Sequence, residues 1–199
     1  SKKGERKMRK ATVSRKTKET DITLTLCLDG SGKTDIDTGI GFFDHMLTAL
    51  AVHGGMDLAV KCRGDLNVDG HHTVEDIGIV FGKALSEALG DKKGIRRFGC
   101  AYVPMDESLA RSVIDLSGRA YLNFDATGLS GMIGGYDSSL TEEFFTAVCS
   151  NAFMNAHIDV IRGRNAHHIC EAVFKSFARA LKEAKKVTGD DIPSTKGSL

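Results

Sequence analysis

The stretch Asp69-Gly-His-His-Thr-Val-Glu-Asp-Ile-Gly78 returns later in the chain as Gly163-Arg-Asn-Ala-His-His-Ile-Cys-Glu-Ala-Val-Phe-Lys175. Both copies hold two adjacent histidines followed, three residues after the second, by a glutamate. The segments downstream match in phase: Phe81, Ala84, Leu85, Glu87 and Ala88 align with Phe177, Ala180, Leu181, Glu183 and Ala184. The apolar spacing of both segments is helical, and Gly90 and Gly189 are predicted to end the two helices. A repeat of this kind indicates a duplicated chain.

The repeat extends upstream of the histidines. Asp44-His45-x-x-Thr48-Ala49 aligns with Glu142-Glu143-x-x-Thr146-Ala147, and each opens a second helical pattern. Glu19-Thr20 with Gly30 aligns with Glu107-Ser108 with Gly118, across a stretch of alternating polarity that favours strands. Strands are expected at residues 11–15, 21–28, 33–36 and 57–62, and again at residues 98–103, 111–116, 120–124 and 158–161.

The predicted fold class is therefore α+β, internally duplicated, with half-repeats at residues 1–93 and 94–199 that form one compact domain. Each half should hold a roughly four-stranded sheet with two helices on one face, because an apolar sheet face must be covered. The two halves should join near residues 92–97.

Composition excludes several classes of partner. The chain has 199 residues, of which 41% are hydrophobic and 27% charged, as in an ordinary globular protein. A net charge of +1 disfavours a nucleic-acid or acidic-membrane partner. Residues 1–19 are locally basic, from Lys2 and Lys3 onward, and this start could be a nucleic-acid arm or a targeting remnant. A charged edge strand is the plainer interpretation, because no aromatic residues interleave with the charges.

The cysteines indicate a reducing compartment. They are Cys27, Cys62, Cys100, Cys149 and Cys170, which are odd in number and never form a CxxC pair. This pattern argues against a disulfide framework or a thiolate zinc site. No apolar run approaches the length of a membrane span or of a signal peptide, so we expect a soluble, cytoplasmic protein.

The histidine doublets are candidate metal ligands. On a helix, residues three and four apart share a face, so each doublet lies on the side of its glutamate. The predicted ligands are His71, His72, Glu75, His167, His168 and Glu171, with His45 as a seventh and its counterpart Glu143 as an eighth. Imidazole and carboxylate without thiolate suit manganese or iron, with zinc as a possible substitute. A lone histidine at a helix start is usually a cap or surface group, and Glu143 could simply complement a helix dipole. Two doublets in register favour the ligand interpretation.

These motifs resemble the two signature motifs of the imidazoleglycerol-phosphate dehydratase family. Gly39-Ile-Gly-Phe-Phe-Asp-His45-Met, Ser117-Gly-Arg119 and Pro193-Ser-Thr-Lys-Gly197 resemble further family segments. The resemblance implies dehydration of imidazole glycerol phosphate to imidazole acetol phosphate in histidine biosynthesis, with two manganese ions per active site. It also implies trimers that assemble into a 24-mer, with active sites at subunit interfaces. One departure is Glu143, where many members have histidine; this exchange could alter the metal preference.

The resemblance further implies a role for each site residue. The reaction removes a poorly acidic proton and a neighbouring hydroxyl, so an imidazolate held by metal and a diazafulvene-like intermediate are expected. Glu19 is the implied acid or base, although alone it resembles an exposed carboxylate beside lysines, and His53 could equally be a structural histidine. The implied catalytic set is Glu19, His45, His71, Glu75, His167 and Glu171. The implied substrate contacts are Glu19, His45, His53, His71, His72 and Glu75, with Arg97, Arg119, Lys175, Ser194, Thr195 and Lys196 around the phosphate.

Two other functions fit the same ligands. A metal-dependent hydrolase could use them to activate water. A noncatalytic shell protein could use them only for assembly, but it would have no need for a phosphate site.

Overall fold

The computed structural model describes residues 6–199, so Lys2 and Lys3 of the basic start lie outside the described residues. The first half contains β1 (Lys10–Lys16), β2 (Thr20–Cys27), β3 (Thr34–Asp37), α1 (Gly41–Gly54), β4 (Asp57–Gly64) and α2 (His71–Leu89). The second half contains β5 (Phe98–Met105), β6 (Ser108–Asp115), β7 (Tyr121–Asp125), β8 (Met132–Ile133), β9 (Tyr136–Asp137), α3 (Leu140–Ala152), β10 (Asn155–Arg162) and α4 (Ala166–Ala184). Apart from the short β8–β9 hairpin, the two halves have the same order of elements.

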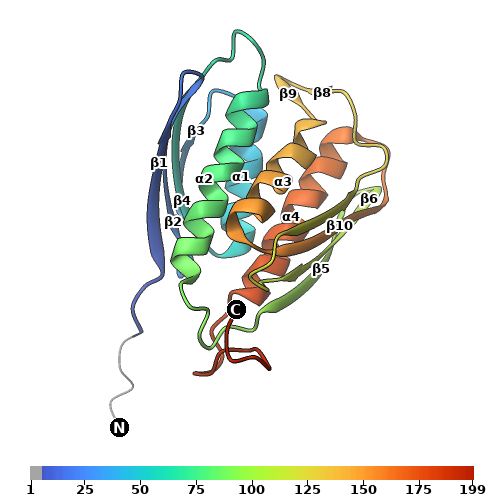
Figure 1. The fold of residues 1–199 in the computed structure, drawn as a ribbon. Coiled ribbons are helices and arrows are strands. Elements are labelled where there is room, and N and C mark those ends of the chain that lie inside the picture. The colour runs from blue at the N-terminus through green and yellow to red at the C-terminus, as the bar shows by residue number, and fades with distance from the viewer. Residues whose placement is uncertain (1–5) are drawn as a thin grey trace.

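The two sheets have the same topology. Their strand orders are β1-β2-β4-β3 and β5-β6-β10-β7, and in each the last strand runs parallel to its neighbour while the other pairs are antiparallel. The predicted α+β class, with two similar halves of four strands and two helices, is confirmed. Strand β1 lies at an edge of its sheet, which agrees with the interpretation of the basic start as a charged edge strand (Figure 1).

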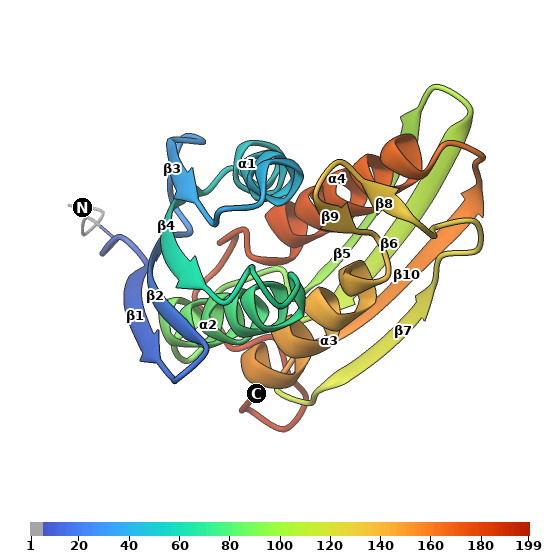
Figure 2. The ribbon, with the colours of Figure 1, turned by 90° about the horizontal axis from the view of Figure 1, so that it is seen from above.

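All four long helices lie between the two sheets (Figure 2). Helix α2 packs on α3 and helix α1 packs on α4, so the helix pairs of the two halves cover each other. Alternation along β2 shows why the sheet needs this cover: Ile22, Leu24 and Leu26 are fully buried, whereas Asp21 and Thr23 face outward. Each such buried side chain contributes about 1.5–3 kcal/mol of transfer free energy.

The helices α2 and α4 begin at the same end of the molecule, and the C-terminus lies at the other end (Figure 1). Gly90 ends α2 with a positive φ of 57°, as predicted. The prediction that Gly189 ends the second long helix is wrong, because α4 already stops at Ala184. The chain leaves the helix there to form a bridge between Val187 and Ile95.

The β8–β9 hairpin is the element that the sequence did not predict. It overlaps a glycine-rich stretch, residues 128–135, and its strands have only two residues each, too few to show a period. None of the helices within residues 6–199 is long and apolar enough to cross a membrane.

Candidate active site

The two histidine doublets sit at the starts of α2 and α4. Asp69 Oδ1 accepts a hydrogen bond from the backbone N–H of His71 at 2.9 Å. Asn165 Oδ1, at the N-cap of α4, accepts one from the N–H of His168 at 3.1 Å. These short polar side chains satisfy N–H groups that a helix start leaves without partners, and so they fix where each doublet begins.

The first histidine of each doublet faces its own glutamate one turn later. His71 Nε2 lies 3.0 Å from Glu75 Oε2, and His167 Nε2 lies 3.0 Å from Glu171 Oε2. In both halves the structure therefore selects the histidine four residues before the glutamate, not the one three residues before it.

A side chain from the other half joins each of these pairs. His71 and Glu75 of α2 meet Glu143 of α3, and we call this group the α2–α3 cluster. His167 and Glu171 of α4 meet His45 of α1, and we call this group the α1–α4 cluster. Within each cluster, one donor atom per residue lies within 4.8 Å of the others, close enough to hold a common metal ion. Six of the eight predicted ligands thus gather in two groups related by the duplication.

The second histidines point elsewhere. His72 Nδ1 lies 2.7 Å from Asp65 Oδ2, and His72 Nε2 lies 3.7 Å from Glu19 Oε2. His168 Nδ1 lies 2.5 Å from Glu107 Oε1, and Glu107 is the counterpart of Glu19 in the repeat. Neither His72 nor His168 joins the two clusters within residues 6–199.

Hydrogen bonds between the second histidines and their carboxylates shift the pKa of one partner in each pair. The hydrogen bond that the His72 ring donates to Asp65 raises the pKa of His72. Hydrogen bonds from the Ser108 hydroxyl and then from His168 lower the pKa of Glu107 to about 2. Neither Asp65 nor Glu107 was among the predicted site residues, although the alignment of Glu107 with Glu19 in the repeat was a signal that could have identified Glu107.

The two clusters differ in their surroundings. The Glu171 side chain is only 8% exposed and its Oε1 accepts a 2.8 Å salt bridge from Lys175 Nζ, whereas the Glu75 side chain is 42% exposed. Burial raises the pKa of Glu171, but the hydrogen bond and charge of Lys175 outweigh it, so the pKa lies below its usual value. The ring of Phe42 packs edge-on against His167, with centroids 5.0 Å apart.

The remaining predicted substrate residues lie in two places. Lys175 is one turn beyond Glu171. The pKa of His53, in the last turn of α1, is lowered mainly by burial and secondly by the charge of Lys175. Arg97 lies at the far end of α4, where its backbone N–H donates to the carbonyl of Ala184 at 2.9 Å. Since a helix rises about 1.5 Å per residue, roughly 25 Å of α4 separates His167 from Ala184.

The C-terminal tail lies at the Arg97 end. Arg97 Nη1 donates to the carbonyl of Pro193 at 3.0 Å, next to Ser194, Thr195 and Lys196. Its guanidinium also pairs with Asp115 at 2.7 Å. Arg119 follows β6 in a turn, and a Cβ on the neighbouring Gly118 would lie 2.9 Å from the backbone of Leu199. The structure thus brings Arg97, Arg119 and the tail to one end and both clusters to the other, and it leaves Lys175 near the middle of α4, with its Nζ in contact with Glu171.

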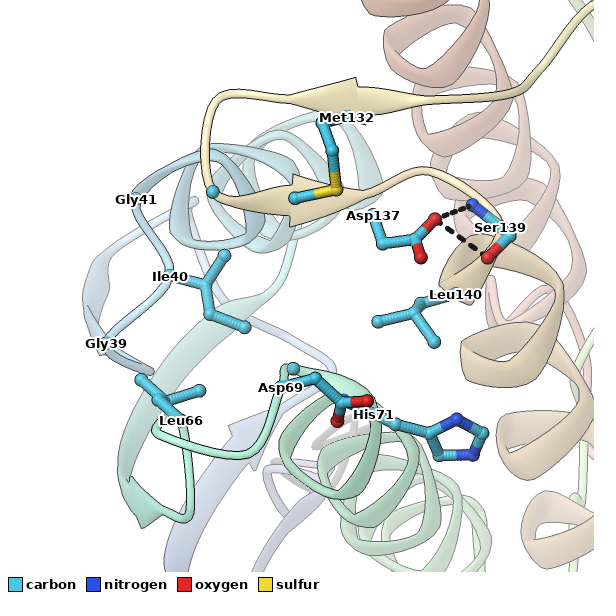
Figure 3. Close-up of a pocket in the computed structure, with 12 residues that line it drawn as sticks. Gly39, Ile40, Gly41, Leu66, Asp69, His71, Met132, Asp137, Ser139 and Leu140 are labelled. Atoms are coloured by element: carbon cyan, nitrogen blue, oxygen red, sulfur yellow. Dashed lines mark hydrogen bonds between the residues drawn. The ribbon is translucent and has the colours of Figure 1, made fainter.

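A pocket of about 420 Å³ opens beside the α2–α3 cluster (Figure 3). It lies between the starts of α1 and α2 and the β8–β9 hairpin, and His71 forms one side of it, away from Gly39 and Leu66. Asp137 is held by the N–H and the hydroxyl of Ser139, at 3.0 and 2.8 Å. The members of the α1–α4 cluster are not among the residues that line it.

The fold and the clusters define a class: duplicated α+β proteins with paired His/Glu groups, compatible with metal, at the starts of two helices. The sequence model of imidazoleglycerol-phosphate dehydratase matches residues 38–181. The chain belongs to the imidazoleglycerol-phosphate dehydratase family, and it is therefore an enzyme of the hydro-lyase class.

Relatives cover nearly the whole chain. Imidazoleglycerol-phosphate dehydratase from Polaromonas sp. is 58% identical over 194 residues, which are 96% of this chain and 94% of the relative. The protein of that name from Chlorobium phaeovibrioides is 52% identical, over 97% of this chain and 96% of the relative. Among solved structures, the enzyme from Staphylococcus aureus matches with a TM-score of 0.81 and 44% identity, over 90% of this chain and 99% of that chain. The enzyme from Pyrococcus furiosus, in complex with (S)-C348, matches with a TM-score of 0.82 and 39% identity, over 94% and 100%.

Proposed function

We propose that this chain dehydrates D-erythro-imidazole glycerol phosphate to imidazole acetol phosphate in the histidine biosynthesis of the cytoplasm, with two manganese ions per active site. The observation that carries the proposal is the pair of His/Glu clusters, each with donor atoms within 4.8 Å, in a member of this family. The five cysteines are free, as expected for a reducing compartment.

The donor set fits manganese. Both clusters offer only imidazole nitrogen and carboxylate oxygen, without thiolate, and such mixed donors suit a divalent ion of this hardness. Each cluster supplies three ligands from its own chain, which leaves positions open for substrate and for His72 or His168 of a neighbouring copy. When bound, the ions supply Lewis-acid stabilisation of the anionic form of the substrate imidazole.

Glu19 is the residue that this proposal assigns to proton transfer. Its Oε2 lies 3.7 Å from His72 Nε2, at the end of the molecule where the clusters lie, and its side chain is 52% exposed. The reaction takes a proton from one carbon and expels hydroxide from its neighbour, so that the hydroxide leaves as water once it gains a proton. Glu19 can accept the first proton or donate the second.

The phosphate residues require a second copy of the chain. Arg97, at the same end as Arg119 and the tail, lies roughly 20–25 Å along α4 from Glu171 and His167, a distance that a glycerol phosphate chain cannot span. Lys175 and His53 lie between the two ends, near the middle of α4, and Lys175 Nζ reaches Glu171 of the α1–α4 cluster at 2.8 Å. A substrate whose imidazole lies at the clusters of one copy therefore reaches Lys175 of that copy and Arg97, Arg119 and Ser194–Lys196 of another.

The outer face of the second sheet supports assembly of copies into trimers and then a 24-mer. Phe98, Tyr102 and Val113 on this face are 56%, 57% and 37% exposed. The aligned positions of the first sheet are Lys10, Ser14 and Thr25. The second sheet is thus apolar at three positions where the first sheet is polar, as expected of a face that is covered by another subunit. The Arg97 guanidinium lies 4.8 Å above the Phe98 ring, so this face adjoins the phosphate residues.

The test is turnover of imidazole glycerol phosphate by protein stripped with a chelator and then resupplied with manganese. The proposal predicts that activity vanishes and returns, and that Glu19→Gln abolishes turnover but still binds manganese. If the metal-loaded protein instead hydrolyses phosphate esters, the alternative function of a metal-dependent hydrolase is favoured. Assembly on metal without any turnover would favour the shell protein, and near-normal activity of Glu19→Gln would exclude its role.

A further inference from the structure

We propose that the two clusters are unequal metal sites: the α2–α3 cluster binds manganese more tightly, and the α1–α4 cluster is the weaker manganese site and the one that retains zinc. The inference rests on the proposed manganese centre and adds an order of filling and a metal preference. The residue that sets the difference is Glu143.

The donor sets of the clusters differ by one exchange. The α2–α3 cluster offers one imidazole and two carboxylates, whereas the α1–α4 cluster offers two imidazoles and one carboxylate. Glu143 and His45 occupy equivalent positions on α3 and α1, so this exchange alone makes the difference. Carboxylate oxygens favour harder ions such as manganese, while imidazoles favour zinc and its neighbours.

The charges differ in the same direction. Glu75 and Glu143 carry two negative charges, and no lysine or arginine within residues 6–199 makes a salt bridge to either. In the α1–α4 cluster the single charge of Glu171 is opposed by Lys175 at 2.8 Å. The position equivalent to Lys175 on α2 is Ile79, so the α2–α3 cluster has no lysine at the place where the α1–α4 cluster has one. A divalent cation is therefore attracted to the α2–α3 cluster, whereas at the α1–α4 cluster it meets a nearly neutral pair of Glu171 and Lys175.

The deeper burial of Glu171 favours manganese at the α1–α4 cluster, but it does not reverse the order of manganese affinity of the two clusters. Glu171 is 8% exposed and Glu75 is 42% exposed, so the attraction to Glu171 is less screened by water. The same low polarity also strengthens the repulsion between Lys175 and an incoming ion. Since Lys175 already contacts Glu171, the two effects largely cancel, and the second carboxylate of the α2–α3 cluster decides the order.

The experiment measures manganese binding by the full chain without substrate. Chelator-stripped protein is titrated with Mn²⁺ while the electron paramagnetic resonance signal of free Mn²⁺ is recorded. A second sample is equilibrated with equal Mn²⁺ and Zn²⁺, and the metals bound per chain are counted by mass spectrometry. The variants are Glu143→Gln, Glu143→His and His45→Gln. Glu142→Gln is the matched control, because Glu142 is an adjacent exposed carboxylate outside both clusters.

The wild-type chain is expected to show two classes of manganese binding. Glu143→Gln should weaken the tighter class by on the order of tenfold to a hundredfold, and Glu142→Gln should not change it. His45→Gln should weaken only the looser class. Glu143→His should bring the two classes together and increase the zinc retained per chain, because both clusters then hold two imidazoles.

Two results would overturn the inference: a tighter class that persists in Glu143→Gln, or one that is lost in His45→Gln. Equal filling of both sites in the wild-type chain would overturn it as well, even with normal dehydratase turnover. Failure of the proposed function is distinguishable, since it shows as absent turnover in a chain that binds manganese in the expected order.

Discussion

Gly78→Ala is a test of how closely α2 must approach α3 for one cluster to form. A Cβ at Gly78 would lie 2.8 Å from the carbonyl oxygen of Phe144 and 2.9 Å from Cβ of Ala147. Ordinary contact begins at 3.4 Å, so α3 would have to move by about 0.6 Å, because a backbone oxygen cannot rotate away. Gly78 follows Glu75 by three residues and Phe144 follows Glu143, so this movement separates the ligands of the α2–α3 cluster.

The cost can be worked out from two opposing effects. Overpacking costs about 1–3 kcal/mol, and with backbone as the obstacle we expect the upper half of this range. Alanine regains about 1 kcal/mol of helix propensity over glycine. The net loss of about 1–2 kcal/mol lowers the melting temperature by about 2–8 °C for a chain of this length.

The assay is calorimetry of the metal-free chain, followed by manganese titration. Gly78→Ala should melt at a lower temperature and bind manganese more weakly at the α2–α3 cluster only, because α1 and α4 do not move. Gly41→Ala is the control, since a Cβ there meets nothing within 4 Å, and its melting temperature should hold or rise. A Gly78→Ala chain that melts at or above the wild-type temperature would refute the reasoning.

Two further changes test other parts of the structure. Burial lowers the pKa of Lys185 from its ordinary value of 10.5 to about 8. Between pH 8 and pH 10.5 the unfolded chain therefore binds more protons at this lysine than the folded chain does. The contribution of Lys185 to the free energy of unfolding rises with pH in this range. Urea unfolding should therefore show the wild-type chain gaining stability over Lys185→Met between pH 8 and pH 10, and parallel curves would contradict this. Tyr102→Ser with Val113→Thr gives the second sheet the residues of the first; analytical ultracentrifugation should then show smaller assemblies, and unchanged assemblies would exclude this face as an interface.

The fold was predictable because the chain carries the same pattern twice. Alternation along β2 and the helical spacing after each doublet identified strands and helices whose residues, such as Leu24 and Phe81, are fully buried. The β8–β9 hairpin was not predictable, since two-residue strands have no period. The end of α4 was mispredicted because a bridge to Ile95, distant in sequence, ends the helix before Gly189 is reached.

Six of the eight predicted ligands gather in the two clusters, but the geometry of the clusters was not predictable from the sequence. Both histidines of a doublet share a helix face with the glutamate, so spacing alone could not show that His71 and not His72 joins the cluster. The pairing of α2 with α3, which brings Glu143 to His71, depends on packing between the halves. Nor does sequence reveal that Arg97 lies at the end of α4, roughly 13 Å along the helix beyond Lys175 and farther still from the clusters.

The central claim is that one catalytic site uses the cluster end of one chain and the Arg97 end of another. The most direct measurement is dehydratase turnover by mixed assemblies of two variants, Arg97→Met and Lys175→Met, denatured together and refolded with manganese. Each variant alone should be nearly inactive. In an equal mixture, half of the chains supply an intact cluster end and half an intact Arg97 end, so about a quarter of the sites should recover turnover. A mixture no more active than its parents would contradict the account.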